Sequence, residues 1–231
     1  SSTTYKIRVT TGVKDFSGNT LSSQYETSSG FTILFTQQLG TSASDVGYGV
    51  TVDSSDNIYV TGYTAGGLDG NTNSGDNDTF LVKYNSSGVK QWTQQLGTSS
   101  QDYARGVTVD SSNNIYVSGS TYGGLDGNTN SGSYDTFLVK YNSSGTKQWT
   151  KHLGSTGGED IGYGITVDSQ NNIYVSGSTM GGLDGNDPLG FGEGSALFLV
   201  KYASGIPAIL VPSGKSASGL YFPVKIPLAR G

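Results

Sequence analysis

The chain has 231 residues and a formal net charge of -5 at pH 7, and only 33% of its residues are hydrophobic. Gly, Ser, Thr and Asn fill 108 positions, which is typical of disorder, but the small net charge and the 15 Tyr favour a folded chain. Cysteine is absent, which excludes a disulfide framework and thiolate metal sites, and a pI of about 4.7 argues against nucleic acid as a partner. No apolar run reaches the roughly 18 residues that a transmembrane segment needs, so we expect none.

The N-terminal segment, residues 1–34, has a strand-like run from Tyr5 to Val9 and a Gly18-Asn19 turn. It is similar to the last strands of a bacterial Ig-like domain of the Big_5 type, and a complete Ig-like domain has about 100 residues. We therefore interpret residues 1–34 as the C-terminal remnant of an Ig-like domain, folded as a β-hairpin. The chain is then expected to be a fragment of a longer protein.

An internal repeat organises the rest of the chain. The segment from Thr36 to Trp92 recurs from Thr93 to Trp149, and 45 of the 57 positions are identical in the two copies. A third copy begins at Thr150 and drifts after Met180. We therefore divide the chain into repeat 1 (35–92), repeat 2 (93–149), repeat 3 with a degenerate end (150–212) and a basic tail outside the repeat (213–231).

Each repeat contains four runs that are rich in β-branched and aromatic residues. In the first copy they cover residues 49–52, 58–61, 80–84 and 90–96. Asn, Asp and Gly at the joints are turn formers, and four strands in a unit of this length are typical of a β-propeller blade. We predict an all-β fold, a partial β-propeller of three four-stranded antiparallel blades, with residues 208–211 as the last strand.

Two runs of the first repeat, GVTVDSSDNIYVTGYT and DTFLVKYNSSGVKQWTQQLGT, are similar to the bacterial SBBP propeller repeat, and the resemblance extends over about residues 35–202. It implies a secreted or surface protein, so we expect an extracellular or bacterial cell-surface location. The run VDSSDNIYV also resembles the NHL type of repeat, which is the alternative. Three blades are too few to close a ring, so the chain is either part of a longer array or associates with further copies.

A long loop between the second and third strands of each repeat carries Asp and Asn between glycines, as in residues 66–78. Calcium binds several oxygens on a sharply turned backbone, so we consider it as a cofactor. The pattern departs from an EF-hand because Gly75 falls at the seventh position and no Glu closes the loop, and the alternative is a metal-free loop of Asx turns. The candidate calcium ligands are Asp69, Asn71, Asn73, Asp76 and Asp78 in repeat 1, and Asp126, Asn128, Asn130 and Asp135 in repeat 2.

Catalytic candidates are few. His152 is the only histidine and replaces a Gln of the repeat, and an acid–base site needs further groups beside it, so we interpret it as drift and predict no catalytic residue. Equivalent aspartates at positions 45, 102 and 160 would form a ring on one face. This ring is either a cation-binding rim or a set of turn caps, and we favour the caps.

Two groups of aromatic residues differ in whether they recur. The recurring group is expected to pack between blades rather than to form a carbohydrate platform; it comprises Tyr59, Tyr116, Tyr174, Trp92 and Trp149. The second group is expected in loops and differs between copies, which favours an exposed contact surface; it comprises Tyr63, Tyr122 and Tyr134.

These observations predict a non-enzymatic propeller scaffold that presents Gly/Asn/Asp-rich loops for binding or adhesion. Its partner would be a protein, a glycan, or another copy that completes the propeller. One alternative is a fragment of a propeller lyase or hydrolase whose catalytic residues lie on missing blades, and another is an NHL-like interaction propeller. An enzyme should concentrate non-repeating acids and His in the loops of one copy, whereas these loops mostly repeat.

Overall fold

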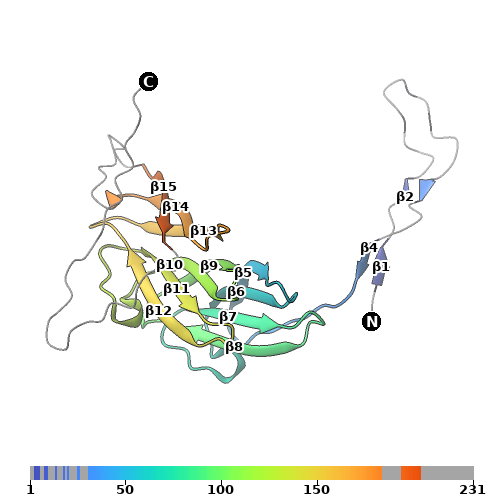
Figure 1. The fold of residues 1–231 in the computed structure, drawn as a ribbon, viewed down its shortest axis with the longest axis horizontal. Helices are drawn as coiled ribbons and strands as arrows, with labels where there is room; N and C mark the ends of the chain where they lie inside the picture. Colours follow the sequence, from blue (N-terminus) through green and yellow to red (C-terminus); the bar gives the residue numbers. More distant parts are fainter. Residues whose placement is uncertain are drawn as a thin grey trace.

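The computed structural model describes residues 31–183 and 194–203, together with residues 3–5, 8–9, 14, 18, 20 and 25–26 near the N-terminus. Apart from two short 3₁₀ turns, the regular structure of this part is β-strand, which confirms the all-β prediction (Figure 1). None of the described helices is long and apolar enough to cross a membrane.

The strands near the N-terminus form two small antiparallel pairs. β1 (Thr3–Tyr5) pairs with β4 (Phe31–Ile33), and β2 (Arg8–Val9) pairs with β3 (Tyr25–Glu26). Pairs this short do not identify a domain type, so the Ig-like remnant stays a prediction. The predicted strand over residues 208–211 and the basic tail lie outside the described residues.

The remaining strands form three antiparallel sheets, one from each repeat, which we call blades 1, 2 and 3. Blade 1 contains β5 (Asp45–Val52), β6 (Ile58–Thr64), β7 (Asp78–Tyr84) and β8 (Lys90–Leu96). Blade 2 contains β9 (Asp102–Val109), β10 (Ile115–Thr121), β11 (Asp135–Tyr141) and β12 (Lys147–Leu153). In blade 3 the structure describes β13 (Asp160–Val167), β14 (Ile173–Thr179) and β15 (Ala196–Tyr202).

The first strand of blade 1 begins earlier than the sequence predicts. In blade 1 the prediction covers residues 49–52, whereas β5 begins at Asp45 because the register shifts between Gly47 and Gly49. Such a shift is a β-bulge, which bends the strand and lets pairing continue beyond it. Equivalent shifts occur in the first pair of strands of the other two blades.

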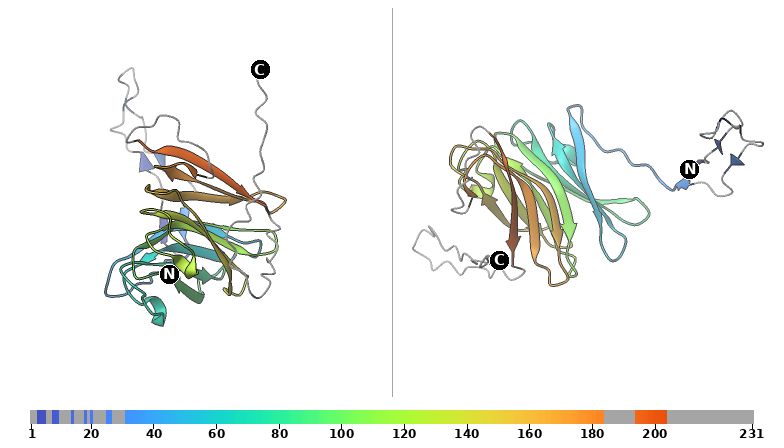
Figure 2. Two further views of the ribbon diagram at one scale, coloured as in Figure 1. Left: turned by 90° about the vertical axis from the view of Figure 1, so that its left-hand side faces the viewer. Right: turned by 90° about the horizontal axis from the view of Figure 1, so that it is seen from above.

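The blades are stacked face to face, and their first strands, β5, β9 and β13, lie beside one another (Figure 2). We call the face of blade 2 or blade 3 that is turned toward the preceding blade its front, and we use the same name for the equivalent face of blade 1. The opposite face of each blade is its back. The back of blade 1 therefore meets the front of blade 2, and the back of blade 2 meets the front of blade 3.

One Tyr and one Leu from the back of each blade form the centre of these contacts. Tyr59 and Leu81 of blade 1 lie in one buried cluster with front residues of blade 2, namely Val107, Ile115, Val117, Phe137 and Val139. Tyr116 and Leu138 of blade 2 lie in a second cluster with Ile173, Val175 and Phe198 of blade 3. Trp92 and Trp149 pack against the same two clusters, so the predicted packing role is confirmed for the recurring aromatics at both contacts.

The turn between the first two strands of each blade is tied to this core by an aspartate. In blade 2 the Asp110 carboxylate accepts hydrogen bonds from the backbone N–H groups of Ser112 and Asn114, at 2.9 and 2.8 Å. It also accepts from the Asn114 side chain at 2.8 Å and from the Tyr116 hydroxyl at 2.9 Å. Asp53 and Asp168 make the same set of bonds in the other blades.

These bonds make stability sensitive to acid. Hydrogen bonds from Asn172, Tyr174 and Gln170 hold the pKa of Asp168 at about 2, below the roughly 3.9 of an unfolded Asp. A lowered folded-state pKa adds stability above pH 4, and this contribution is lost as the pH falls toward 2. Urea unfolding between pH 5 and pH 2 should show the free energy of unfolding falling in that window, less steeply for Asp168→Asn. A constant value from pH 4 to pH 2 would contradict this.

Candidate functional site

The loop predicted to bind calcium begins with a 3₁₀ turn, η1 (Leu68–Gly70), in which Asp69 has a positive φ of 57°. Its carboxylate forms an ion pair with Lys90 and accepts a hydrogen bond from the Thr93 hydroxyl at 2.8 Å. These two hydrogen bonds, Lys90 first, lower the pKa of Asp69. Asp69 therefore ties the loop to β8. In repeat 2, η2 (Leu125–Gly127) places Asp126 equivalently, bound to Lys147 and Thr150.

Three of the other four candidate ligands of repeat 1 also make hydrogen bonds within or beside the loop. Asn71 and Asn73 donate their side-chain amides to backbone carbonyl groups at 2.8–3.0 Å. Asp78 is buried and accepts from the Ser74 backbone N–H at 2.8 Å, whereas Asp76 is exposed. In repeat 2, Asn128, Asn130 and Asp135 repeat this arrangement.

No group of three or more His, Asp or Glu side chains in the described part of the chain is placed to hold a metal ion. The loop shape is explained by its own hydrogen bonds, as the metal-free alternative requires, and calcium binding stays a prediction. If these loops bind calcium, thermal melting in millimolar calcium should give a higher Tm than melting with a chelator, because binding to the folded state alone stabilises it. An unchanged Tm would contradict calcium binding.

The ring of equivalent aspartates acts as a set of turn caps. Asp45 accepts from the Thr41 backbone N–H and hydroxyl groups, at 2.6 and 3.1 Å. Asp102 and Asp160 accept from the corresponding residues of their own blades and are fully buried. Carboxylates buried in this way contribute to the structure of the turns, and the capping interpretation is confirmed.

His152 lines a polar pocket of blade 2. The equivalent Gln95 accepts from the Leu68 backbone N–H at 2.9 Å and donates to the Gly66 carbonyl group at 3.1 Å and to Asp78 at 3.0 Å. Both ring nitrogens of His152 are buried without a hydrogen-bond partner, and Nδ1 lies 3.8 Å from the Asp135 carboxylate. The cavity beside it has a volume of about 380 Å³ and is lined by Asn128, Thr129, Ser131, Asp135, His152, Leu153 and Gly154.

Restoring glutamine at this position should stabilise the chain. A net hydrogen bond contributes about 1 kcal/mol, and Gln95 makes three that His152 lacks. We expect His152→Gln to raise the free energy of unfolding by about 1–2 kcal/mol in urea titrations, and Gln95→His to lower it by a similar amount. Equal stability of both variants and the wild type would refute this reading of the pocket.

A second set of side chains gathers across all three blades. We call it the tyrosine–arginine surface, and it comprises Tyr48, Tyr63, Tyr103, Arg105, Tyr122, Tyr134 and Tyr163. Its rings form a continuous series, with centroid separations of 5.9 Å from Tyr48 to Tyr63 and 5.0 Å from Tyr63 to Tyr103. The series continues at 6.4 Å to Tyr134 and at 5.2 Å from there to Tyr122.

Arg105 lies at the centre of this surface. Its guanidinium carbon is 5.6 Å from the ring centroids of Tyr48 and Tyr103, and 5.3 Å from that of Tyr163. These are cation–π distances, so three rings hold the arginine in place. Its Nε atom is buried and has no hydrogen-bond partner. The surface thus presents one fixed cation among aromatic rings.

The tyrosines differ in exposure. Tyr48, Tyr122 and Tyr163 are each 51% exposed, whereas Tyr103 and Tyr134 are half-buried. Burial raises the pKa of the hydroxyl groups of the last two. The Tyr103 hydroxyl accepts from Asn77 at 3.1 Å, and the Tyr134 hydroxyl donates to Gln101. The half-buried rings therefore hold fixed positions under the exposed ones.

The surface forms where the repeats depart from one another. Repeats 1 and 2 differ at 12 positions, and six of these pairs contribute to the surface or to its hydrogen bonds, namely 44/101, 46/103, 48/105, 63/120, 65/122 and 77/134. The sequence singled out Tyr63, Tyr122 and Tyr134, but Tyr63 lies in β6 and not in a loop. It missed Tyr48, Tyr103, Arg105 and Tyr163, which a comparison of differing positions between the copies would have brought forward.

Comparison with known families agrees with the sheet pattern. A family model described as Beta-propeller repeat, of the SBBP type, matches residues 34–69, 91–126 and 148–184, one match for each blade. The three sheets are blades of a partial β-propeller, and the chain is similar to this repeat family. The matched segments include the first two strands of each blade of the propeller.

Two curated proteins are similar to this propeller chain. It is 26% identical over 217 residues to an uncharacterized WD repeat-containing protein of Acanthamoeba polyphaga mimivirus, a match that covers 74% of this chain and 16% of that protein. It is 28% identical over 174 residues to the regulatory protein FlaEY of Caulobacter vibrioides, covering 68% of this chain and 18% of that protein. The chain spans less than a fifth of the length of these relatives.

Proposed function

We propose that this propeller is a non-enzymatic interaction scaffold, secreted or at the bacterial cell surface, and that it binds its partner through the tyrosine–arginine surface. The observation that supports this most is the gathering of the differing positions. Residues that only maintain the fold recur in phase, whereas most residues of this surface lie at positions that differ between repeats 1 and 2 and yet lie together in space.

The chemistry of the surface favours a protein partner. Tyr and Arg are the residues most enriched at the centres of protein–protein interfaces, because they combine large contact area with hydrogen bonding at a small entropic cost. Arg105 would attract an acidic side chain, and the exposed rings of Tyr48, Tyr122 and Tyr163 would pack against apolar groups. A glycan is the second candidate, since the same exposed rings offer faces for sugar stacking.

The predicted role of the Gly/Asn/Asp-rich loops changes in this proposal. Their Asp and Asn side chains bond to their own blade, as Asp69 and Asn73 show, so fewer polar groups remain for a partner. The names of the two relatives, a WD repeat-containing protein and a regulatory protein, agree with an interaction role. We assign the loops to shaping the blades and the tyrosine–arginine surface to binding.

The test exchanges residues between repeats so that the fold is kept. A triple variant, Tyr63→Ser, Arg105→Tyr and Tyr122→Ala, gives each position the residue of the other repeat. Peptides selected by display against the wild-type chain should bind the triple variant at least tenfold more weakly, a loss of about 1.4 kcal/mol. The matched control is Val89→Thr, which also exchanges a repeat residue but lies outside the surface.

Equal peptide binding by the wild type and the triple variant would overturn the assignment of this surface. A glycan array run in parallel decides between the partner classes, because glycan signals that vanish in the triple variant would favour the glycan candidate. The enzyme alternative is tested by activity screening of the full-length protein. Turnover that disappears on mutation of one loop residue would replace the scaffold proposal.

A further inference from the structure

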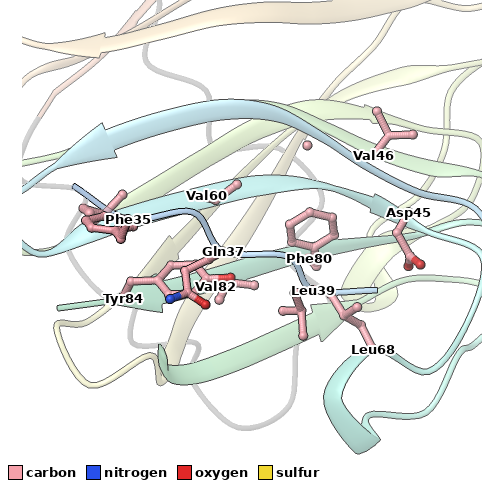
Figure 3. A pocket seen from close by; sticks show the side chains of 12 residues that line it. Phe35, Gln37, Leu39, Asp45, Val46, Val60, Leu68, Phe80, Val82 and Tyr84 are labelled. Atoms are coloured by element: carbon pink, nitrogen blue, oxygen red, sulfur yellow. The ribbon is translucent and has the colours of Figure 1, made fainter. Parts of the chain in front are cut away.

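The front of blade 1 has an open apolar pocket. It has a volume of about 300 Å³, and its lining includes Val60, Leu68, Phe80, Val82 and Tyr84 (Figure 3). Each of these residues has an equivalent 57 positions later on the front of blade 2, and there the equivalents are buried in the contact with blade 1. The pocket is therefore lined by the residues of a blade-to-blade contact, but no described blade packs against it.

The contact between blades 1 and 2 shows what such a pocket accepts. On the front of blade 2 the space is filled by Tyr59 and Leu81 from the back of blade 1. On the front of blade 3 it is filled by Tyr116 and Leu138 from the back of blade 2. A Tyr–Leu pair is thus the natural occupant of the front of a blade, and on blade 1 this place is open.

The back of blade 3 carries the equivalent pair, and none of the described blades packs against it. Tyr174 and Leu199 are equivalent to Tyr116 and Leu138 in the strand register. Leu199 is 66% exposed and the adjacent Leu197 is 83% exposed, whereas Leu138 is 1% exposed. Lys201 lies 5.2 Å from the Tyr174 ring centroid, as Lys140 lies 5.4 Å from that of Tyr116, so the ring is held in the same way.

Residues 35–39, which precede β5, lie at one edge of the pocket, where the last strand of a preceding blade would lie. Phe35 and Leu39 precede Trp92 and Leu96 by 57 positions, and both line the pocket (Figure 3). Phe35 packs against Gly88 as Trp92 packs against Gly145 at the contact of blades 1 and 2. The chain therefore supplies one edge of a missing blade contact, and the centre of that contact is open.

We propose that a second copy of this chain docks head to tail, with Tyr174 and Leu199 of one copy inserted into the pocket on the front of blade 1 of the other. The two faces are complementary and different, so the interface is of the heterologous kind that either closes into a ring or continues as a filament. Propellers close with four to eight blades, and two copies of three blades fall within that range. For the 231-residue chain taken alone, with its three described blades, the expected assembly is a closed dimer with two equal interfaces.

The open faces also carry the apolar area that such an interface needs. On the front of blade 1, Val50 and Val52 are 69% and 58% exposed, whereas the equivalent Val107 is 8% exposed in blade 2. A monomeric soluble protein rarely exposes contiguous apolar faces of this kind unless they bind something. The front of blade 1 and the back of blade 3 both expose apolar side chains. Each of these faces is equivalent to one side of the contacts seen between the described blades.

The experiment measures the mass of the full 231-residue chain by sedimentation velocity over a range of protein concentrations. A front-blocked variant carries Val50→Asp and Val52→Asp, and a back-blocked variant carries Leu197→Asp and Leu199→Asp. All four side chains are exposed, so these changes should leave the fold of the single copy intact. Val89→Asp is the matched control, because it charges an exposed valine in the turn between β7 and β8.

We expect the wild type and the Val89→Asp control to sediment at twice the 24.0 kDa chain mass, and each blocked variant to sediment as a monomer. Mixing the two blocked variants should restore a dimer, because the back of the front-blocked copy and the front of the back-blocked copy are both intact. A wild type that stays monomeric at high concentration would overturn the proposal. So would a back-blocked variant that still dimerises, since that result indicates a symmetric front-to-front contact.

Discussion

Replacing Asp110 by alanine is expected to lower the free energy of unfolding by about 3–5 kcal/mol. The carboxylate is buried and accepts four hydrogen bonds, two from the backbone of its turn and two from the side chains of Asn114 and Tyr116. Its removal leaves the buried Tyr116 hydroxyl without this acceptor, which costs about 1–3 kcal/mol, and loses three part-buried hydrogen bonds that contribute about 1 kcal/mol each. The loss also frees the ring of Tyr116, which occupies the centre of the contact between blades 2 and 3.

Urea titration followed by tryptophan fluorescence measures this effect, since Trp149 packs on the same cluster. Tyr116→Phe removes only one of the four bonds and should cost about 1 kcal/mol. Asp76→Ser is the control, because it removes a carboxylate from an exposed position where repeat 2 already has Ser133. If Asp110→Ala and Asp76→Ser have the same stability, the aspartate does not have the role that its hydrogen bonds indicate.

A methyl group added at Gly119 is expected to destabilise the chain by about 3 kcal/mol. A Cβ atom there would overlap the carbonyl oxygen of Tyr103 and lie 2.8 Å from the Cα atom of Ala104. Both are backbone atoms of β9 at the bulge, so the clash is relieved only by moving the strand that contacts blades 1 and 3. Overpacking of this kind costs about 1–3 kcal/mol, and more where backbone must shift.

The matched control for Gly119→Ala is Gly47→Ala. A Cβ atom at Gly47 would have only an ordinary contact, 3.6 Å from a methyl group of Val60, and repeat 2 already carries Ala104 at this position. We expect a Tm close to that of the wild type for the control and a loss of several degrees for Gly119→Ala. Similar Tm values for the two variants would show that the bulge accommodates a side chain.

Most of the architecture could be predicted because it is local and repeated. The β-branched runs and the Asx and Gly turns recur every 57 positions, and each hairpin is closed by residues near in sequence, as Asp110 and Asn114 are. Strand lengths were less accurate. The bulge beside Gly47 that extends β5 depends on a strand partner and has no signal in the hydrophobic pattern.

The candidate site was predicted only in part. Tyr122 and Tyr134 were recognised because they break the repeat, and the structure places their rings 5.2 Å apart. Arg105 and Tyr103 break it as well, but their meeting with Tyr48 and Tyr163 depends on how three blades stack. His152 was read as drift, and only its burial beside Asp135 shows the hydrogen bonds that the substitution removes.

The amino-acid sequence by itself determined the number of repeats, the strands and turns within them, and the propeller class, because these follow from the period of apolar residues and from turn chemistry within a few residues. Only the tertiary structure decided which faces of the blades are covered and which are open, and which departures from the repeat lie together. The physical reason is that blade contacts join residues about 57 positions apart through side-chain packing. A residue such as Leu199 has the same character as Leu138 in the sequence, and differs from it only in what covers it.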